Sequence, residues 1–241
     1  MQRTGWSSLL CWCGWVTLAA LAAWPMLAVA QVSTSVAPTP AQLAVQVPSK
    51  AAQPTQFIPP GWELEQQKVA DLNGDGRDDA LLLMRKSDSS GTPQRILAVV
   101  LRELGDSDGY VLAELNPRLI PHSDNANQED PMAEGELTAE RGGFDIKLTL
   151  LAGAGSYQMA RLQYRFRYRD GCFRLIGYNR METNRATLDT RDLSVNFLTG
   201  SMVHQTGNAQ SDTTEKQSDA LKTNPRLCFG DLDSAAVFNP Q

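Results

Sequence analysis

The stretch from Ala160 to Arg169, ARLQYRFRYR, decides the fold class of this 241-residue chain. Its apolar residues take every second position, which is the period of a β-strand that buries one face, whereas a helix would scatter them around its circumference. Asp170 and Gly171 follow, and this pair favours the positive φ angles of a two-residue type I′ turn. Cys172 to Tyr178 is then the returning strand. The sequence therefore predicts an antiparallel hairpin.

Four further segments carry strand signals, and no segment carries a convincing helical period with caps at both ends. Residues 80–84 and 96–101 are short apolar runs bounded by turn residues, residues 144–150 alternate, and residues 193–198 end at a Thr-Gly pair. We expect a mainly β fold with one antiparallel, sheet-rich domain, built as a sandwich, a barrel or a partial propeller. Roughly 185 residues are enough for such a domain to bury a sizeable core.

Residues 1–30 have the pattern of a secretory signal peptide. Arg3 is their only charge, an apolar core extends to about Leu27, and Ala28-Val29-Ala30 matches the small-x-small cleavage pattern. A membrane anchor is the alternative, but it needs about 20 apolar residues with a flanking stop signal, and Trp24-Pro25 interrupts the stretch. No later segment is apolar enough to span a bilayer. We expect export to the periplasm or the extracellular space.

Residues 31–56 consist almost entirely of Ala, Pro, Gln, Ser, Thr and Val, with Lys50 as the only charge. Such a stretch buries too little apolar surface to offset the entropy of ordering it, so we expect a disordered, flexible tether. The segment that begins at Phe57 combines large apolar groups with turn residues. This places the predicted folded domain at residues 57–241.

Cys172 and Cys228 are the only cysteines after residue 30. In an oxidising compartment, two thiols favour one disulfide. Two buried free thiols or a metal site are the alternatives. A structural zinc site takes four nitrogen or sulfur ligands, and only His122 and His204 are left to complete one. We expect a Cys172–Cys228 disulfide.

The charge balance argues against nucleic acid as a partner. The formal net charge is −5, whereas binding to phosphates needs a basic footprint. A local basic patch is still compatible with this total, and the predicted hairpin supplies one.

The hairpin gathers arginines on the face opposite its apolar side chains. With a two-residue turn, Arg167 opposes Arg174, Arg161 opposes Arg180, and Gln163 opposes Tyr178. The arginines predicted to share this surface are Arg161, Arg165, Arg167, Arg169, Arg174 and Arg180. Like charges that face each other need compensation, either from acidic side chains and the C-terminal segment of the same chain or from an anionic partner. An acidic polysaccharide, a lipid headgroup or an acidic protein would be such a partner.

The loop from Asp71 to Asp79, DLNGDGRDD, has the spacing of a calcium loop. The oxygen-bearing side chains at its positions 1, 3, 5 and 9 are Asp71, Asn73, Asp75 and Asp79. Gly76, at position 6, allows the sharp bend that turns the carbonyl of Arg77 inward. An EF-hand has a bidentate Glu at position 12, but here that residue is Leu82, so the loop is not part of an EF-hand.

Residues 69–83, VADLNGDGRDDALLL, resemble the loop of FG-GAP or VCBS-type repeats, the calcium-binding hairpins of integrin-like β-propellers. The resemblance implies Ca²⁺ as a structural ion. Its implied ligands are Asp71, Asn73, Asp75, Asp79 and the carbonyl of Arg77. Propellers repeat this motif several times, whereas this chain has one good copy, so a full propeller is not expected. The chain as a whole also resembles exported bacterial proteins with a single such loop. The alternative to a calcium site is that the loop is a tight, solvated turn without metal.

Signatures of a catalytic centre are missing from the sequence. It has no G-x-S-x-G elbow, no phosphate loop and no cofactor fingerprint, and its histidines lie in polar surroundings typical of the surface. The candidates for an acidic hydrolytic site are two carboxylate pairs, Glu134 with Glu136 and Asp189 with Asp192. Two function classes follow. One is a non-catalytic, calcium-braced exported module that binds a ligand or associates with the envelope; the other is a small exported hydrolase that acts on envelope polymers.

Overall fold

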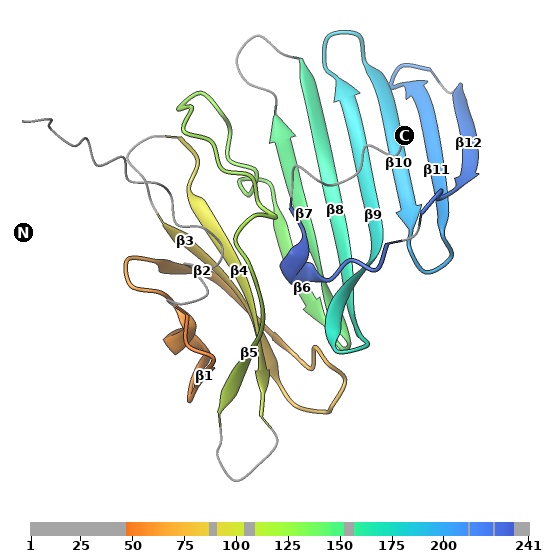
Figure 1. The fold of residues 1–241 in the computed structure, drawn as a ribbon. Helices are drawn as coiled ribbons and strands as arrows, with labels where there is room; N and C mark the ends of the chain where they lie inside the picture. Colours follow the sequence, from red (N-terminus) through yellow and green to blue (C-terminus); the bar gives the residue numbers. More distant parts are fainter. Residues whose placement is uncertain are drawn as a thin grey trace, which may run out of the picture. The chain divides into compact units, whose positions relative to one another are not determined.

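The chain forms two antiparallel β-sheets that pack against each other (Figure 1). The computed structural model describes residues 47–86, 91–103, 109–151, 157–211, 213–223 and 225–233. The first sheet has the order β1-β5-β4-β3-β2, from β1 (Lys50–Ala51), β2 (Glu63–Ala70), β3 (Asp79–Lys86), β4 (Gln94–Arg102) and β5 (Tyr110–Asn116). The second sheet has the order β12-β11-β10-β9-β8-β7-β6, from β6 (Glu136–Glu140), β7 (Gly143–Leu151), β8 (Gln158–Arg169), β9 (Cys172–Asn184), β10 (Asp189–Asn196), β11 (Ser201–Asn208) and β12 (Thr214–Ala220). The predicted mainly β, antiparallel fold class is confirmed.

Two short 3₁₀-helices, η1 (Pro54–Phe57) and η2 (Phe229–Asp231), complete the described elements. Neither these nor any other helix in the described part of the chain has both the length and the apolar character needed to cross a bilayer.

The predicted hairpin consists of β8 and β9, and its apolar side chains lie at the centre of the core. Asp170 and Gly171 form the turn with φ angles of 54° and 85°. Tyr168 faces Phe173 across the hairpin, and Arg167 faces Arg174 as predicted. The inner face of the second sheet, to which these two rings belong, shares one hydrophobic cluster with side chains of the first sheet. Those side chains are Leu81, Leu83, Leu97 and Val99.

The first sheet is buried on both faces, which explains why residues 80–84 and 96–101 are continuous apolar runs instead of alternating ones. One face packs on the second sheet. The other face presents Leu82 and Ala98, and Val47 and Phe57 from the N-terminal side belong to the same hydrophobic cluster.

The folded part of the chain therefore begins earlier than predicted. Lys50 pairs with Val111 at the edge of the first sheet, and Val47 is only 4% exposed. Residues 47–56, which the prediction placed in the tether, are ordered because they cover an apolar face. Residues 1–46, with the predicted signal peptide and the rest of the tether, lie outside the described residues.

A β-bulge in β9 changes the predicted surface of the hairpin. Ile176 has no partner in β8, and beyond it Leu162, instead of Arg161, faces Arg180. The predicted pairs that this corrects are Arg161 with Arg180 and Gln163 with Tyr178. Because a shift of one residue moves side chains to the other face of a sheet, Arg180 lies on the inner face and is not part of the arginine surface.

A buried arginine ties the loop after β5 to the first sheet. The side chain of Arg95 is 2% exposed; it donates to Glu65 at 2.7 and 2.9 Å and to Asp130 at 2.6 and 2.7 Å. Burial alone would lower the pKa of Arg95, but the two carboxylates raise it far above its usual value, so it stays charged. Burial alone would raise the pKa of Asp130, but hydrogen bonds from Arg95 and from the amide of Met132 hold it below its usual value.

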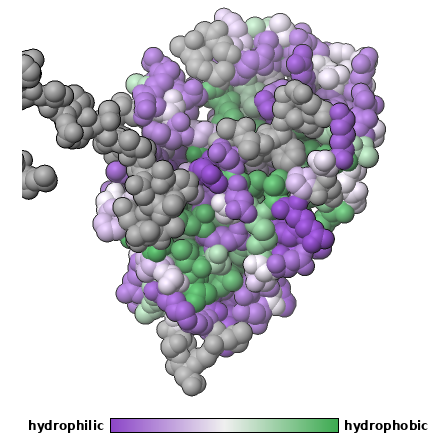
Figure 2. All heavy atoms as spheres, viewed as in Figure 1, coloured by the Kyte–Doolittle hydropathy of each residue, from purple (hydrophilic) through white to green (hydrophobic). Residues whose placement is uncertain are grey.

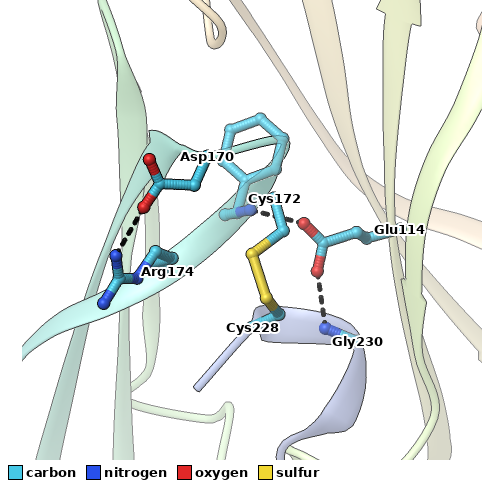
Figure 3. The surroundings of a disulfide bond; sticks show 7 residues. Glu114, Asp170, Cys172, Arg174, Cys228 and Gly230 are labelled. Atoms are coloured by element: carbon cyan, nitrogen blue, oxygen red, sulfur yellow. Dashed lines mark hydrogen bonds and ion pairs between the residues drawn. A yellow bond between two sulfur atoms is a disulfide. The ribbon is translucent and has the colours of Figure 1, made fainter. Parts of the chain in front are cut away.

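The predicted Cys172–Cys228 disulfide is present (Figure 3). Glu114 of β5 lies beside it, and its carboxylate accepts hydrogen bonds from the amide nitrogens of Phe173 and Gly230, the latter at 2.7 Å. Burial raises the pKa of Glu114, and the two amide bonds oppose that rise in part. One carboxylate from the first sheet thus joins β9 to the C-terminal segment, residues 225–233.

The C-terminal segment also fills the core between the sheets. The ring of Phe229 is fully buried, with its centroid 5.2 Å from that of Phe144 and 5.3 Å from that of Phe166. The amide of Asn116 donates to the carbonyls of Phe229 and Leu232, the latter at 2.9 Å. These bonds satisfy backbone groups that would otherwise be buried without partners.

Candidate functional site

The predicted calcium loop connects β2 to β3, and hydrogen bonds from its own backbone hold its side-chain oxygens. Asp71 Oδ2 accepts from the amide of Gly76 at 3.0 Å, Asn73 Oδ1 from Asp75 at 2.9 Å, and Asp75 Oδ1 from Arg77 at 2.9 Å. Gly76 has a φ of 88°, a conformation that residues with a Cβ rarely adopt. The side chains at positions 1, 3 and 5 are therefore positioned by the loop itself.

Asp79 has a different environment from the other predicted ligands. Its side chain is fully buried; Oδ2 accepts from the amide of Leu72 at 2.9 Å, and Oδ1 accepts from the amide of Arg102 at 2.8 Å. Burial raises the pKa of Asp79, and these hydrogen bonds act in the opposite direction. Both oxygens of Asp79 thus already join the loop to the backbone of β4.

One buried oxygen of the loop has no hydrogen-bond partner among the described residues, namely Oδ1 of Asp71. The other oxygen of this carboxylate lies 3.3 Å from Nε of Arg141. A buried acceptor without a donor is a suitable position for a cation, and carboxylate, amide and carbonyl oxygens are the ligands that Ca²⁺ prefers. The loop therefore fits Ca²⁺ in the type of its donors.

Two observations limit that fit. Leu82, at position 12, is fully buried, so this position supplies no carboxylate. Within the described ranges, no group of three or more His, Cys, Asp or Glu side chains is placed to hold a metal ion. Any site at this loop depends on Asn73 and on a backbone carbonyl as well as on carboxylates.

Each of the five arginines predicted to bind a ligand lies next to a carboxylate of the chain. The pairs are Arg161 with Glu134 (4.0 Å), Arg165 with Asp145 (3.1 Å), Arg167 with Asp145 (3.5 Å) and Glu140, Arg174 with Asp170 (2.7 Å), and Arg180 with Glu182. These pairs neutralise the arginines, and those among them that are exposed contribute little to stability. The compensation from within the chain, one of the two explanations considered for the arginines, is therefore present.

The carboxylates considered for a hydrolytic site are distributed over two hollows. Asp189 and Asp192 lie on opposite faces of β10, because residues three apart in a strand point to opposite sides. Asp189 lines a cavity on the inner face of the second sheet, whereas Asp192 and Glu134 line a trough on its outer face. The carboxylate of Glu136 is paired with Lys147, with Oε2 of Glu136 2.6 Å from Nζ of Lys147. The carboxylates that share a hollow are thus Glu134 and Asp192, which come from different predicted pairs.

The inner cavity has a volume of about 720 Å³ and opens between the loop of residues 117–135 and strands β7 to β10. Figure 2 shows apolar residues exposed near the middle of one face of the molecule, with hydrophilic residues along the margin at β12. Leu150 and Met159 contribute to the cavity wall, and Arg180 and Glu182 contribute polar groups. It is an amphipathic cavity, and its charged lining residues also include Asp189 and Arg191.

The outer trough has a volume of about 570 Å³ and extends over β7 to β11. Met181 of β9 lies in it and is 51% exposed, with Asp192 opposite in β10. Gln163 and Asn179 are nearby lining residues. Sequence reasoning missed this trough because its polar side chains look like an ordinary solvated face; the only signal was a methionine at an outward position among them.

Comparison of the chain with models of known protein families, with characterised proteins and with solved structures found no match. The likeness to FG-GAP and VCBS repeats therefore rests on residues 69–83 alone. Function has to be inferred from the loop and the hollows themselves.

Proposed function

We propose that this protein is an exported, non-catalytic binding module that associates with the cell envelope and is braced by Ca²⁺ at the loop of residues 71–79. The observation that carries the calcium part is the buried Oδ1 of Asp71, which has no hydrogen-bond donor among the described residues and stands at position 1 of the loop. The likeness of residues 69–83 to FG-GAP and VCBS repeats supports the same ion.

In this proposal the ion is held by side-chain oxygens and one carbonyl. The residues that would hold it are Asp71, Asn73, Asp75, Asp79 and Arg77, the last through its carbonyl. Ca²⁺ would neutralise the carboxylates at the turn and restrain the β2–β3 connection. Because position 12 supplies no carboxylate, we expect weak binding, with a dissociation constant of about 10⁻⁴ to 10⁻³ M as in extracellular modules.

Export is supported by the pattern of residues 1–30 and by the disulfide. A Cys172–Cys228 bond is compatible with an oxidising compartment such as the periplasm or the extracellular space. Mass spectrometry of protein from its native compartment tests this proposal. A mature N-terminus at Gln31 supports export, and an intact N-terminus refutes cleavage.

Calorimetry with and without Ca²⁺ tests the proposed ion. At ten times the dissociation constant, linkage stabilises the folded state by about 1.4 kcal/mol, a rise of about 3 to 5 °C in melting temperature. Asp75→Ala should abolish the response, whereas Asp78→Ala, which removes an exposed carboxylate at a position that is not a predicted ligand, should keep it. Mg²⁺ should act more weakly because it demands tighter octahedral geometry. An unchanged melting temperature up to about 10 mM Ca²⁺ would contradict the proposal.

The ligand is expected to lie on the outer face of the second sheet. The sequence suggested an anionic polysaccharide, a lipid headgroup or an acidic protein, recognised by Arg161, Arg165, Arg167, Arg174 and Arg180. Because each of these arginines has a carboxylate partner in the chain, we favour a polymer of low net charge. The salt dependence of binding distinguishes these ligands. Binding to an anionic polymer should weaken steeply as salt rises from roughly 50 to roughly 500 mM, because salt screens exposed charges, whereas binding to a neutral polymer should not.

A small hydrolase that acts on envelope polymers is the second candidate, because Glu134 and Asp192 line the same trough. If the protein releases reducing ends from envelope polymers and Asp192→Asn or Glu134→Gln abolishes that release, the enzyme is the correct reading. Retention of such polymers without turnover supports the binding module.

A further inference from the structure

A continuous hollow on the outer face of the second sheet follows β9. The trough over Met181 and a neighbouring hollow of about 320 Å³ have three lining residues in common, which are Gln163, Asn179 and Ser194. The second hollow lies over Gly177, which has no side chain to fill the space. From Gly177 to Met181 a strand advances by about 13 Å at 3.3 Å per residue. The hollow is therefore long enough for a linear molecule.

A ladder of neutral polar side chains crosses the floor of this hollow. The Gln163 amide donates to Asp145 at 3.1 Å, the Asn179 amide donates to Gln163 Oε1 at 3.3 Å, and Ser194 Oγ donates to Asn179 Oδ1 at 2.8 Å. These bonds fix the orientation of the two amides. Besides the groups used in these bonds, each amide has a second N–H and a second carbonyl lone pair. Donors and acceptors for a ligand therefore lie side by side along the hollow.

Met181 and Asp192 add an apolar contact and an acceptor. Met181 is 51% exposed and presents a polarizable thioether between polar neighbours. Asp192, opposite it in β10, has no hydrogen-bond or ion-pair partner within the described residues. An ionised carboxylate only accepts hydrogen bonds and has room for two adjacent O–H donors.

The charges around the hollow largely cancel. Lys147 lies 2.6 Å from Glu136, and Arg161 lies 4.0 Å from Glu134. Asp192 is then the charged lining residue without a partner among the described residues, and it would repel an anionic ligand. An uncharged ligand rich in hydroxyl groups fits this surface better.

We infer that this hollow binds a linear, uncharged oligosaccharide segment, with sugar hydroxyls bonded to Asp192, Gln163 and Asn179 and the C–H face of one ring on Met181. A hydroxyl both donates and accepts, so it matches the mixed donors and acceptors of the ladder. A pre-formed hollow of several hundred Å³ with a few converging polar groups is typical of ligand sites. The inference rests on the proposed binding function and names its ligand class.

Methionine-methyl NMR tests the site directly. The chain has seven methionines, and two of them are internal controls: Met84 is fully buried, and Met202 is 9% exposed in the core. We expect chitotetraose, cellotetraose or maltotetraose to shift the ¹³C-methyl signal of Met181 saturably, while the signals of Met84 and Met202 stay in place. An unmoved Met181 signal with all three sugars at about 10 mM, ten times a millimolar dissociation constant, would overturn the inference.

Asp192→Asn tests the chemistry of the site, because it keeps the size of the side chain and removes its charge. We expect the affinity for the responding sugar to fall about tenfold, as for the loss of charge-assisted hydrogen bonds. Asp219→Asn, the same change in β12 opposite the core residue Met202, should leave the affinity unchanged. Equal affinity of the Asp192→Asn protein and the unmodified protein would refute the role of Asp192.

Tetragalacturonate, a linear anionic tetrasaccharide, tests whether the ligand is uncharged. Weaker binding than that of the neutral sugars is expected, and tighter binding with a shift of Met181 would overturn the assignment. The proposed binding function can survive a failure here. If the protein retains envelope polymer but the methyl signal of Met181 does not change, this site alone is refuted. If the protein retains no envelope polymer at all, the binding function is refuted.

Discussion

Replacing Glu114 by glutamine will destabilise the protein, because this carboxylate joins the two sheets and the disulfide-linked C-terminal segment at one point (Figure 3). Two amide donors, from Phe173 and Gly230, converge on it. Glutamine offers one acceptor and one donor, so one of these N–H groups loses its acceptor. An unpaired buried donor costs about 1 to 3 kcal/mol, which lowers the melting temperature by about 2 to 12 °C for a domain of this size.

The size of this effect depends on pH in a defined direction. Burial raises the pKa of Glu114 above its usual value of 4.5, so the folded state keeps a proton that the unfolded chain has lost. The stability that this adds is fully present below about pH 4.5 and is lost as the pH rises through the folded pKa. Glutamine does not titrate. The difference in unfolding free energy between the unmodified protein and Glu114→Gln should therefore be largest at low pH and narrow toward pH 7.

Urea unfolding of both proteins between pH 4 and pH 8, followed by circular dichroism, measures this difference. Glu136→Gln is the matched control, because the Glu136 side chain is 53% exposed and the change should cost less than about 0.5 kcal/mol. Equal stability of Glu114→Gln and the unmodified protein at pH 7, or a difference that grows as the pH rises, would refute the reasoning.

Three further changes have defined outcomes. Arg95→Met should lower the free energy of unfolding in urea by about 3 to 5 kcal/mol at pH 7, because it leaves two carboxylates without their buried partner. Since the pKa of Asp130 is lowered in the folded protein, this loss of stability should be present above pH 3.8 and shrink as the pH falls through the folded pKa. Serine at both Cys172 and Cys228 should cost about 4 kcal/mol on the chain-entropy estimate for a separation of 56 residues, and thiol titration of the otherwise unmodified chain without residues 1–30 should find no free thiol. Gly143→Ala should destabilise the protein in thermal unfolding, because its Cβ would lie 2.1 Å from a carbonyl oxygen of β8, whereas Gly142→Ser, where no atom lies within 4 Å, should show only the strain of a positive φ.

The sequence by itself determined the features that depend on neighbouring residues. Alternation in Ala160 to Arg169 and the Asp170-Gly171 pair predicted the central hairpin and its turn, and the short apolar runs predicted β3 and β4. The disulfide followed from counting the cysteines that remain after residue 30. These predictions succeeded because turn chemistry and the two-residue period act within a few residues.

Strands without an apolar period were not predictable in this way. β12, with the sequence TEKQSDA, is exposed at every residue, and β2, with ELEQQKVA, is mostly polar. Such strands form because a neighbouring strand offers unpaired backbone groups, and the sequence of the strand itself contains no record of that neighbour. The start of the domain at Val47, ten residues before the prediction, has the same kind of cause: an apolar face of β3 and β4 had to be covered.

Only the tertiary structure decided which side chains meet. The single unpaired residue Ile176 moved Arg180 from the predicted outer surface to the inner face, and the acidic partners of the remaining arginines come from other strands and turns. Glu114 meets amides more than 50 residues away, and Asp192 shares a trough with Glu134 of a distant loop. One residue of register reverses a strand's faces, and long-range contacts depend on how the sheets pack. Local sequence therefore determined the strands with an apolar pattern and the loop, while packing between strands and sheets determined the sites.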